Sequence, residues 1–116
     1  MITPLVEKLF ISIKAKGHIN PLLPDYNLTC VIVTGKEKIY FSLSKVNLAI
    51  IEDVERVDVK IEGSLETVSS IISGHTALRK SDIVFAGSFR HQLLLDSIFS
   101  LCRDRENSLT EENLVM

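Results

Sequence analysis

The side chains that could carry out chemistry are few and scattered. Three histidines, His18, His75 and His91, lie in separate parts of the 116-residue chain, and neither a Gly-x-Ser-x-Gly nor a His-Glu-x-x-His motif is present. A serine nucleophile needs an adjacent base, and a catalytic zinc ion needs several ligands at fixed spacing. The sequence therefore predicts a protein that is not an enzyme and that holds no metal.

The cysteines and acidic residues point the same way. Cys30 lies in a strand-like run and Cys102 at the end of a helical one, without a Cys-x-x-Cys pair or a histidine at ligand spacing, so we expect two buried structural thiols. The carboxylates of Glu52, Asp53 and Glu55 could bind a cation, but the same cluster is typical of a solvated turn. We predict no cofactor.

Two glycine–serine pairs sit within one repeated pattern. Residues 58–65 and 82–89 each contain an acid, alternating apolar residues, Gly-Ser and an apolar residue that opens an amphipathic run. Alternation with period two predicts a strand, and serine before a run of period 3.6 predicts a helix start. A helix start can bind anions, but Gly63 and Gly87 lack a glycine-rich loop with its lysine, which favours plain strand-to-helix turns. We expect at least one of them to have a positive φ or to leave no room for a Cβ.

Composition limits the class of protein. A chain of 116 residues with 46% hydrophobic content is predicted to form one domain. Its 13 basic and 15 acidic side chains give a formal charge of -2, which predicts no nucleic-acid partner. No apolar run is long enough to cross a bilayer, and Glu7 and Lys8 interrupt the start of the chain. We therefore expect a cytoplasmic protein without a transmembrane segment.

The elements that must position these residues can be read from the periodicity. Thr3 and Pro4 are typical of a helix cap and the first residue of the helix, Gly17 ends that helix, and Pro21 and Pro24 predict an irregular connection. The predicted strands are 28–34, 39–44, 46–51, 57–62 and 83–86, and the later helices are 65–73 and 88–102. The fold class predicted is α+β: one domain with a mixed, mostly antiparallel sheet of about five strands and helices packed on it.

The last helix carries more apolar surface than one sheet can easily cover. Six apolar residues between Leu94 and Cys102 span an arc of roughly 160°, while Phe89 and Leu93 lie outside it. Three explanations fit the pattern: tight core packing together with the chain end, a partner protomer, or a ligand cavity.

From about Val57 to Leu101 the chain resembles the sterol carrier protein 2 (SCP-2) family. The residues that carry the resemblance are Asp58, Val59, Ile61, Gly63, Leu65, Ile72, Gly74, Phe85, Ala86, Gly87, Leu94 and Phe99. The resemblance implies a five-stranded sheet beside helices that enclose an apolar tunnel for sterols, fatty acids, fatty acyl-CoAs or phospholipids.

On this basis we expect residues 1–102 to form a lipid-binding domain and residues 103–116 a charged tail. The expected function is non-enzymatic binding of a fatty acyl chain, sterol-like molecule or other lipid in an internal hydrophobic cavity, as a carrier or accessory domain. The side chains expected to line the cavity, chosen by strand parity and helical arc, are Phe41, Leu43, Val59, Ile71, Phe85, Phe89, Leu93 and Phe99. The alternative is a protein interaction module, a homodimer or an accessory subunit of a lipid-pathway enzyme, with a packed core and no ligand.

Overall fold

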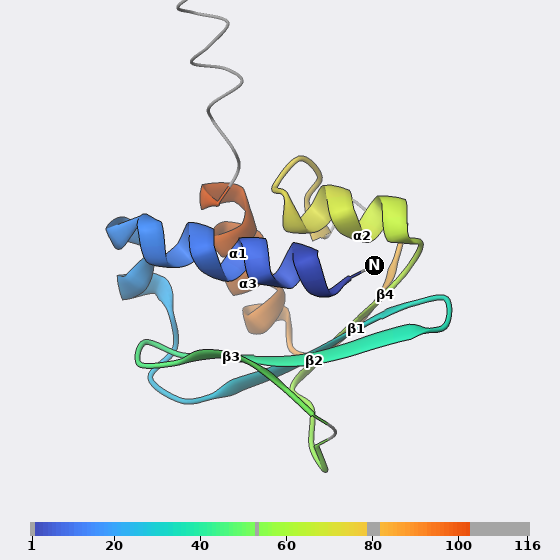
Figure 1. Ribbon diagram of the computed structural model, residues 1–116, viewed down its shortest axis with the longest axis horizontal. Helices are drawn as coiled ribbons and strands as arrows, with labels where there is room; N and C mark the ends of the chain where they lie inside the picture. Colours follow the sequence, from blue (N-terminus) through green and yellow to red (C-terminus); the bar gives the residue numbers. More distant parts are fainter. Residues whose placement is uncertain (1, 53, 79–81, 103–116) are drawn as a thin grey trace, which may run out of the picture.

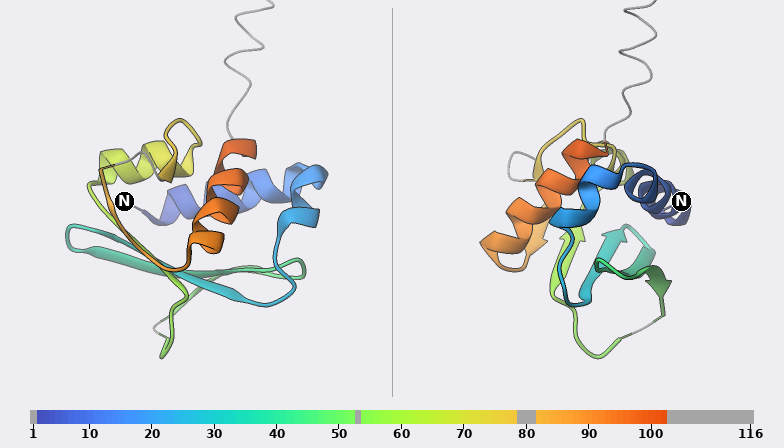
Figure 2. Two further views of the ribbon diagram at one scale, coloured as in Figure 1. Left: turned by 180° about the vertical axis from the view of Figure 1, so that it is seen from behind. Right: turned by 90° about the vertical axis from the view of Figure 1, so that its left-hand side faces the viewer.

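Two layers make up the protein, a five-stranded sheet and a set of helices on one of its faces (Figure 1, Figure 2). The computed structural model describes residues 2–52, 54–78 and 82–102. In chain order the elements are α1 (Thr3–Ala15), the 3-10 helix η1 (Gly17–Leu22), β1 (Leu28–Thr34), β2 (Glu37–Leu43), β3 (Leu48–Ile51), β4 (Val59–Glu62), α2 (Leu65–Ile72), β5 (Val84–Ala86) and α3 (Phe89–Leu101). The predicted α+β class is confirmed.

The sheet is mixed and mostly antiparallel, as expected. Its strand order is β3-β2-β1-β4-β5, and only the central pair of β1 and β4 is parallel among the strand pairs described. Because β3 lies at one edge and β4 on the other side of β1, the chain must cross the sheet between Ile51 and Val59. This connection runs on the face that carries no helices (Figure 1).

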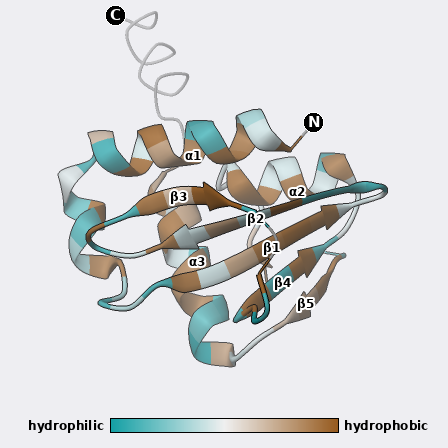
Figure 3. Cartoon of the chain, turned by 60° about the horizontal axis from the view of Figure 1, so that its bottom comes forward, coloured by the Kyte–Doolittle hydropathy of each residue, from teal (hydrophilic) through white to brown (hydrophobic). Residues whose placement is uncertain are grey.

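Alternation along the strands separates the two faces of the sheet. Phe41, Cys30 and Val59 are in register on β2, β1 and β4, and all three are fully buried beneath the helices. The next row, Tyr40, Val31 and Lys60, points to the uncovered side, which we call the open face. Figure 3 views the sheet from this side and shows largely apolar strands.

The first helix packs on the covered face. The ring of Phe10 meets that of Phe41 edge to face, with 6.0 Å between the ring centres. The helix begins at Thr3, whose predicted capping role is wrong, because Ile2 occupies the cap position and no side chain caps the helix. The connection expected to be irregular contains η1, which includes Pro21. A 3-10 turn tolerates this proline because only some of its amides need carbonyl partners.

The two glycine–serine turns confirm the predicted helix starts. The Ser64 hydroxyl accepts a hydrogen bond from the Thr67 amide, and the Ser88 hydroxyl accepts one from the His91 amide, both at 3.1 Å. Gly87 has a φ of 153°, and a Cβ added to it would lie 3.0 Å from the Asp58 carbonyl oxygen. These turns direct α2 and α3 back over the covered face.

Most of the broad apolar arc of α3 is accounted for by the core. Leu95, Ile98 and Phe99 are buried within the main hydrophobic cluster, and Leu94 and Leu101 pack against its edge. The Lys16 ammonium donates a hydrogen bond to the Leu101 carbonyl oxygen and so joins the ends of α1 and α3. The predicted tail, residues 103–116, lies outside the described residues. Core packing is therefore the arrangement observed for this arc.

Candidate functional site

The eight side chains predicted to line a cavity fall into three groups. Five of them belong to the main core cluster: Phe41, Leu43, Val59, Ile71 and Phe99. Phe85 is half-buried and packs against this cluster. Phe89 and Leu93 are exposed, by 68% and 39%. The structure thus brings six of the eight together around one core and leaves two on the outer side of α3.

A cleft lies between α3 and the segment after α2, and two of the predicted lining residues, one exposed and one buried, border it. It has a volume of about 460 Å3, and both Leu93 and Phe99 line it. Asp96 lies in the same cleft and accepts a hydrogen bond from the Leu78 amide at 2.6 Å. This bond fastens the segment after α2 to α3. The cleft therefore has a fixed wall and reaches from the surface to the edge of the core.

A second cleft lies on the other side of Leu93, between α3 and the residues that follow η1. Its volume is about 450 Å3, and its apolar lining includes Leu22, Leu93 and Leu94. His91 and Tyr26 stand at this cleft, with 2.8 Å between the His91 Nε2 and the Tyr26 hydroxyl oxygen. Because Leu93 lines both hollows, we refer to them together as the α3 clefts.

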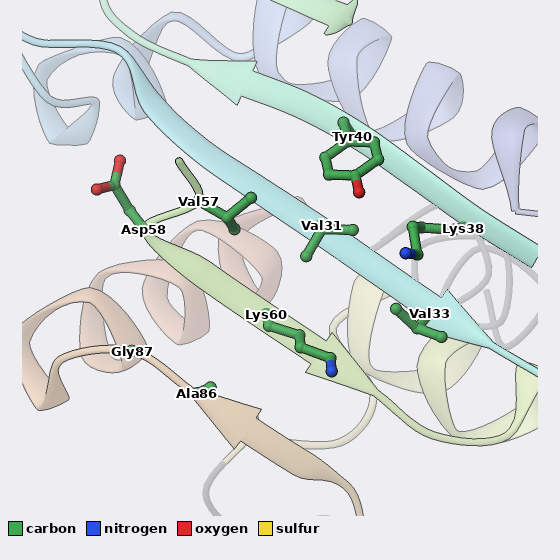
Figure 4. A pocket seen from close by; sticks show the side chains of 9 residues that line it. All are labelled: Val31, Val33, Lys38, Tyr40, Val57, Asp58, Lys60, Ala86 and Gly87. Atoms are coloured by element: carbon green, nitrogen blue, oxygen red, sulfur yellow. The ribbon is translucent and has the colours of Figure 1, made fainter. Parts of the chain in front are cut away.

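A third hollow lies on the open face of the sheet and was not predicted (Figure 4). This groove has a volume of about 610 Å3. Its lining is Val31, Val33, Lys38, Tyr40, Val57, Asp58, Lys60, Ala86 and Gly87. Val31 and Val33 alternate along β1 with buried residues, so the sequence pattern could have predicted that these two side chains face the open side. The contribution of Val57 could not be read from the sequence, because it depends on where the connection between β3 and β4 crosses.

The charges of the open-face groove are separated along its length. The side chains of Lys38 and Lys60 reach toward Val33 at one end, whereas Asp58 lies at the other (Figure 4). The Lys60 ammonium is 3.3 Å from a Glu62 carboxylate oxygen, and the Lys38 ammonium is 5.9 Å from the centre of the Tyr40 ring. The groove thus has a basic end and an acidic end with apolar residues between them.

Both cysteines are held in the thiol form. Burial, reinforced by the negative charge of Asp58, raises the pKa of the Cys30 thiol far above its ordinary value. Burial also raises the pKa of Cys102 to about 11, although the nearby Lys16 acts in the opposite direction. The thiolate is the nucleophilic form of cysteine, so neither side chain is suited to act as a nucleophile near neutral pH.

Other groups capable of chemistry are likewise dispersed. Within residues 2–52, 54–78 and 82–102 there is no cluster of three or more histidine, cysteine, aspartate and glutamate side chains that could hold a metal ion. The same residues contain no helix long and apolar enough to cross a membrane. The contacts described for His91 are with Tyr26 and, through its backbone amide, with the Ser88 cap.

Comparison with solved structures shows the fold. A ubiquinone synthesis protein described as UbiJ-SCP2 superimposes with a TM-score of 0.56 and 8% sequence identity, covering 74% of this chain and 78% of its own. A Thermus thermophilus protein, TT1886, described as possibly a sterol carrier protein, has a TM-score of 0.51 and 10% identity over 87% of each chain. The chain has an SCP-2-like fold.

A third similar structure is an enzyme. The inverting sec-alkylsulfatase Pisa1 from Pseudomonas sp. matches with a TM-score of 0.52 and 15% identity over 73% of this chain, but over only 14% of its own. The likeness therefore concerns a small part of that enzyme. The sequence matches no protein-family model and no curated protein sequence at a significant level.

Proposed function

We propose that this protein binds an apolar ligand, such as a fatty acyl chain or related lipid, as a non-enzymatic carrier or accessory domain formed by residues 1–102. The observation that carries the proposal is the pair of α3 clefts, where Leu93 is exposed beside the buried Phe99 in an SCP-2-like fold. Exposed apolar side chains gathered around a hollow favour a ligand or partner over bare solvent.

The packed core bears on how a ligand would enter. An empty apolar cavity of roughly 400 Å3 would cost about 10 kcal/mol at 24 cal/mol per Å3, which equals the whole stability of a small domain. A ligand-free protein is therefore expected to close such a cavity. In this proposal an acyl chain first occupies the α3 clefts, and the expected internal cavity opens only as α3 moves away from the rest of the hydrophobic core.

A fluorescent fatty acid tests the proposal. We expect saturable binding with one ligand per chain at the α3 clefts and displacement by unlabelled long-chain acyl compounds. Leu93→Asp should weaken binding because it places a carboxylate in the lining of both α3 clefts. The Leu93 side chain is exposed, so circular dichroism should show that the variant folds.

The matched control is Ile11→Asp, which changes an exposed apolar side chain on α1 that is 68% accessible. It should leave binding unchanged. Absence of saturable binding across fatty acid, acyl-CoA and sterol would overturn the proposal. Equal weakening by Ile11→Asp would remove the α3 clefts as its site.

A protein interaction module is the second candidate, and the position of Phe89 favours it. This ring is 68% exposed at the start of α3 and is not among the residues that line either α3 cleft. Aromatic side chains commonly anchor interfaces. If Phe89 anchors a homodimer, sedimentation should show a concentration-dependent dimer that Phe89→Asp converts to a monomer. A monomer at all concentrations would contradict this homodimer.

A further inference from the structure

The open-face groove differs from a flat sheet surface because the connection between β3 and β4 adds to one side of it. Val31 points away from the helices, yet only 5% of it is exposed, whereas its outward neighbour Val33 is half-buried. Val57 lies beside Val31 and comes from the connection that crosses the sheet (Figure 4). A groove of about 610 Å3 with this raised side suits a thin chain better than the broad surface of a partner protein.

The charges at the groove determine the direction in which a charged ligand can lie. Lys38 and Lys60 flank Val33 at one end, and Asp58 would repel an anion at the other. Glu62 partly neutralises Lys60, so Lys38 supplies most of the attraction. Asp58 is itself anchored, since its carboxylate accepts a hydrogen bond from the Thr29 amide at 3.1 Å. An amphiphile with an anionic head therefore fits in one direction only.

We propose that the open-face groove binds a straight-chain fatty carboxylate, with its carboxylate between Lys38 and Lys60 and its alkyl chain against Val31 and Val57. This site is separate from the α3 clefts and lies on the opposite face of the sheet. Four residues of β1 separate the level of Val33 from that of Thr29, or about 13 Å along the strand. With carbon–carbon bonds of about 1.5 Å, this length accommodates roughly ten carbon atoms.

Isotope-labelled full-length protein titrated with decanoate, below the concentration at which it forms micelles, tests the proposal by NMR. The amide signals of β1, β2 and β4 should shift. Decanoate should bind at least about tenfold more tightly than 1-decanol, because only the acid offers a charge to Lys38. From octanoate to decanoate the affinity should rise by about fourfold per added methylene.

Lys38→Gln should reduce the preference for decanoate over 1-decanol to less than about threefold, since one hydrogen bond to a charged group is lost. The matched control is Lys36→Gln, which removes the same charge two residues away in the β1–β2 turn, outside the groove lining. It should keep the preference. Val57→Asp should weaken the binding of both ligands, and circular dichroism should confirm that it folds.

Three results would overturn the proposal. The first is an unchanged preference for the carboxylate in Lys38→Gln. The second is a set of shifted signals confined to η1 and α3, which would place decanoate in the α3 clefts and support the proposed function alone. The third is self-association of the ligand-free protein that shifts the same β1 and β2 signals, because a second copy would then occupy the open face. Conversely, Ile11→Asp, at an exposed position of α1 outside the groove lining, should leave the decanoate-induced shifts of β1, β2 and β4 unchanged.

Discussion

At the scale of single residues, the two turn glycines are expected to differ in how well they tolerate a side chain. In Gly87→Ala the new methyl would meet the Asp58 carbonyl oxygen at 3.0 Å on a backbone with a φ of 153°, and neither can easily move. We expect a loss of about 1–3 kcal/mol in the free energy of unfolding, measured by urea denaturation. An unchanged midpoint would contradict the strand-to-helix turn at Gly87.

In Gly63→Ala the new methyl group would contact a side chain and not the backbone. The added Cβ would lie 2.7 Å from Ile83 Cγ2, and Ile83 is only half-buried. The double variant Gly63→Ala/Ile83→Ala should therefore be more stable than the sum of its single variants indicates, by about 0.5 kcal/mol or more. Gly17→Ala, where nothing lies within 4 Å, is the control. Strict additivity of the two changes would show that this contact does not limit position 63.

Cys102 predicts a pH dependence of stability. Its pKa rises from the ordinary value of 9.0 to about 11 on folding because burial disfavours the thiolate. Below pH 9 the thiol is neutral in both states, and its contribution to stability is fully present. Between pH 9 and 11 the unfolded chain releases the proton first, so this contribution is lost as pH rises. Stability should therefore fall less steeply in Cys102→Ala than in the parent, and parallel curves would contradict the shift.

At the scale of elements, α3 has one side that is buried in the core and another that is exposed to solvent. Leu95→Ala removes a side chain that is 0% exposed, so it should cost about 2–5 kcal/mol in the free energy of unfolding. Leu93→Ala removes one that is 39% exposed and should cost less than about 1 kcal/mol. Chemical denaturation of the two variants measures the difference, and equal losses would contradict this division of the helix.

The sequence predicted elements better than it predicted surfaces. Period-two alternation in residues 39–43 correctly placed Phe41 and Leu43 on the covered face, and the serines before α2 and α3 correctly marked their starts. These signals are local. Whether a side chain on α3 lines a cavity or fills the core depends on what α1, η1 and the sheet bring against it, which involves residues far away in the chain. Phe99 and Leu93 therefore received one predicted role but occupy different environments.

At the scale of the whole molecule, one hydrophobic core joins both layers. It contains residues of α1, α2, α3 and strands β1, β2 and β4. We therefore expect a single cooperative unfolding transition. The chain has no tryptophan and two tyrosines, Tyr40 on the open face and Tyr26 beside α3. Their fluorescence, measured separately in Tyr26→Phe and Tyr40→Phe, should change at the same urea concentration as the far-ultraviolet circular dichroism. Distinct midpoints would indicate that the layers unfold independently.

From the parallel pairing of β1 with β4 we expect an order in folding. The β1–β2 hairpin and its continuation into β3 close through short loops, so they can form early and locally. The partner of Cys30 on β4 is Val59, and between these residues the chain completes two other strands and returns across the sheet. Closing that larger loop costs more entropy before any contact compensates for it. A partly folded chain that lacks β4 would leave one edge of β1 unpaired, and an unpaired strand edge favours wrong strand pairing and aggregation.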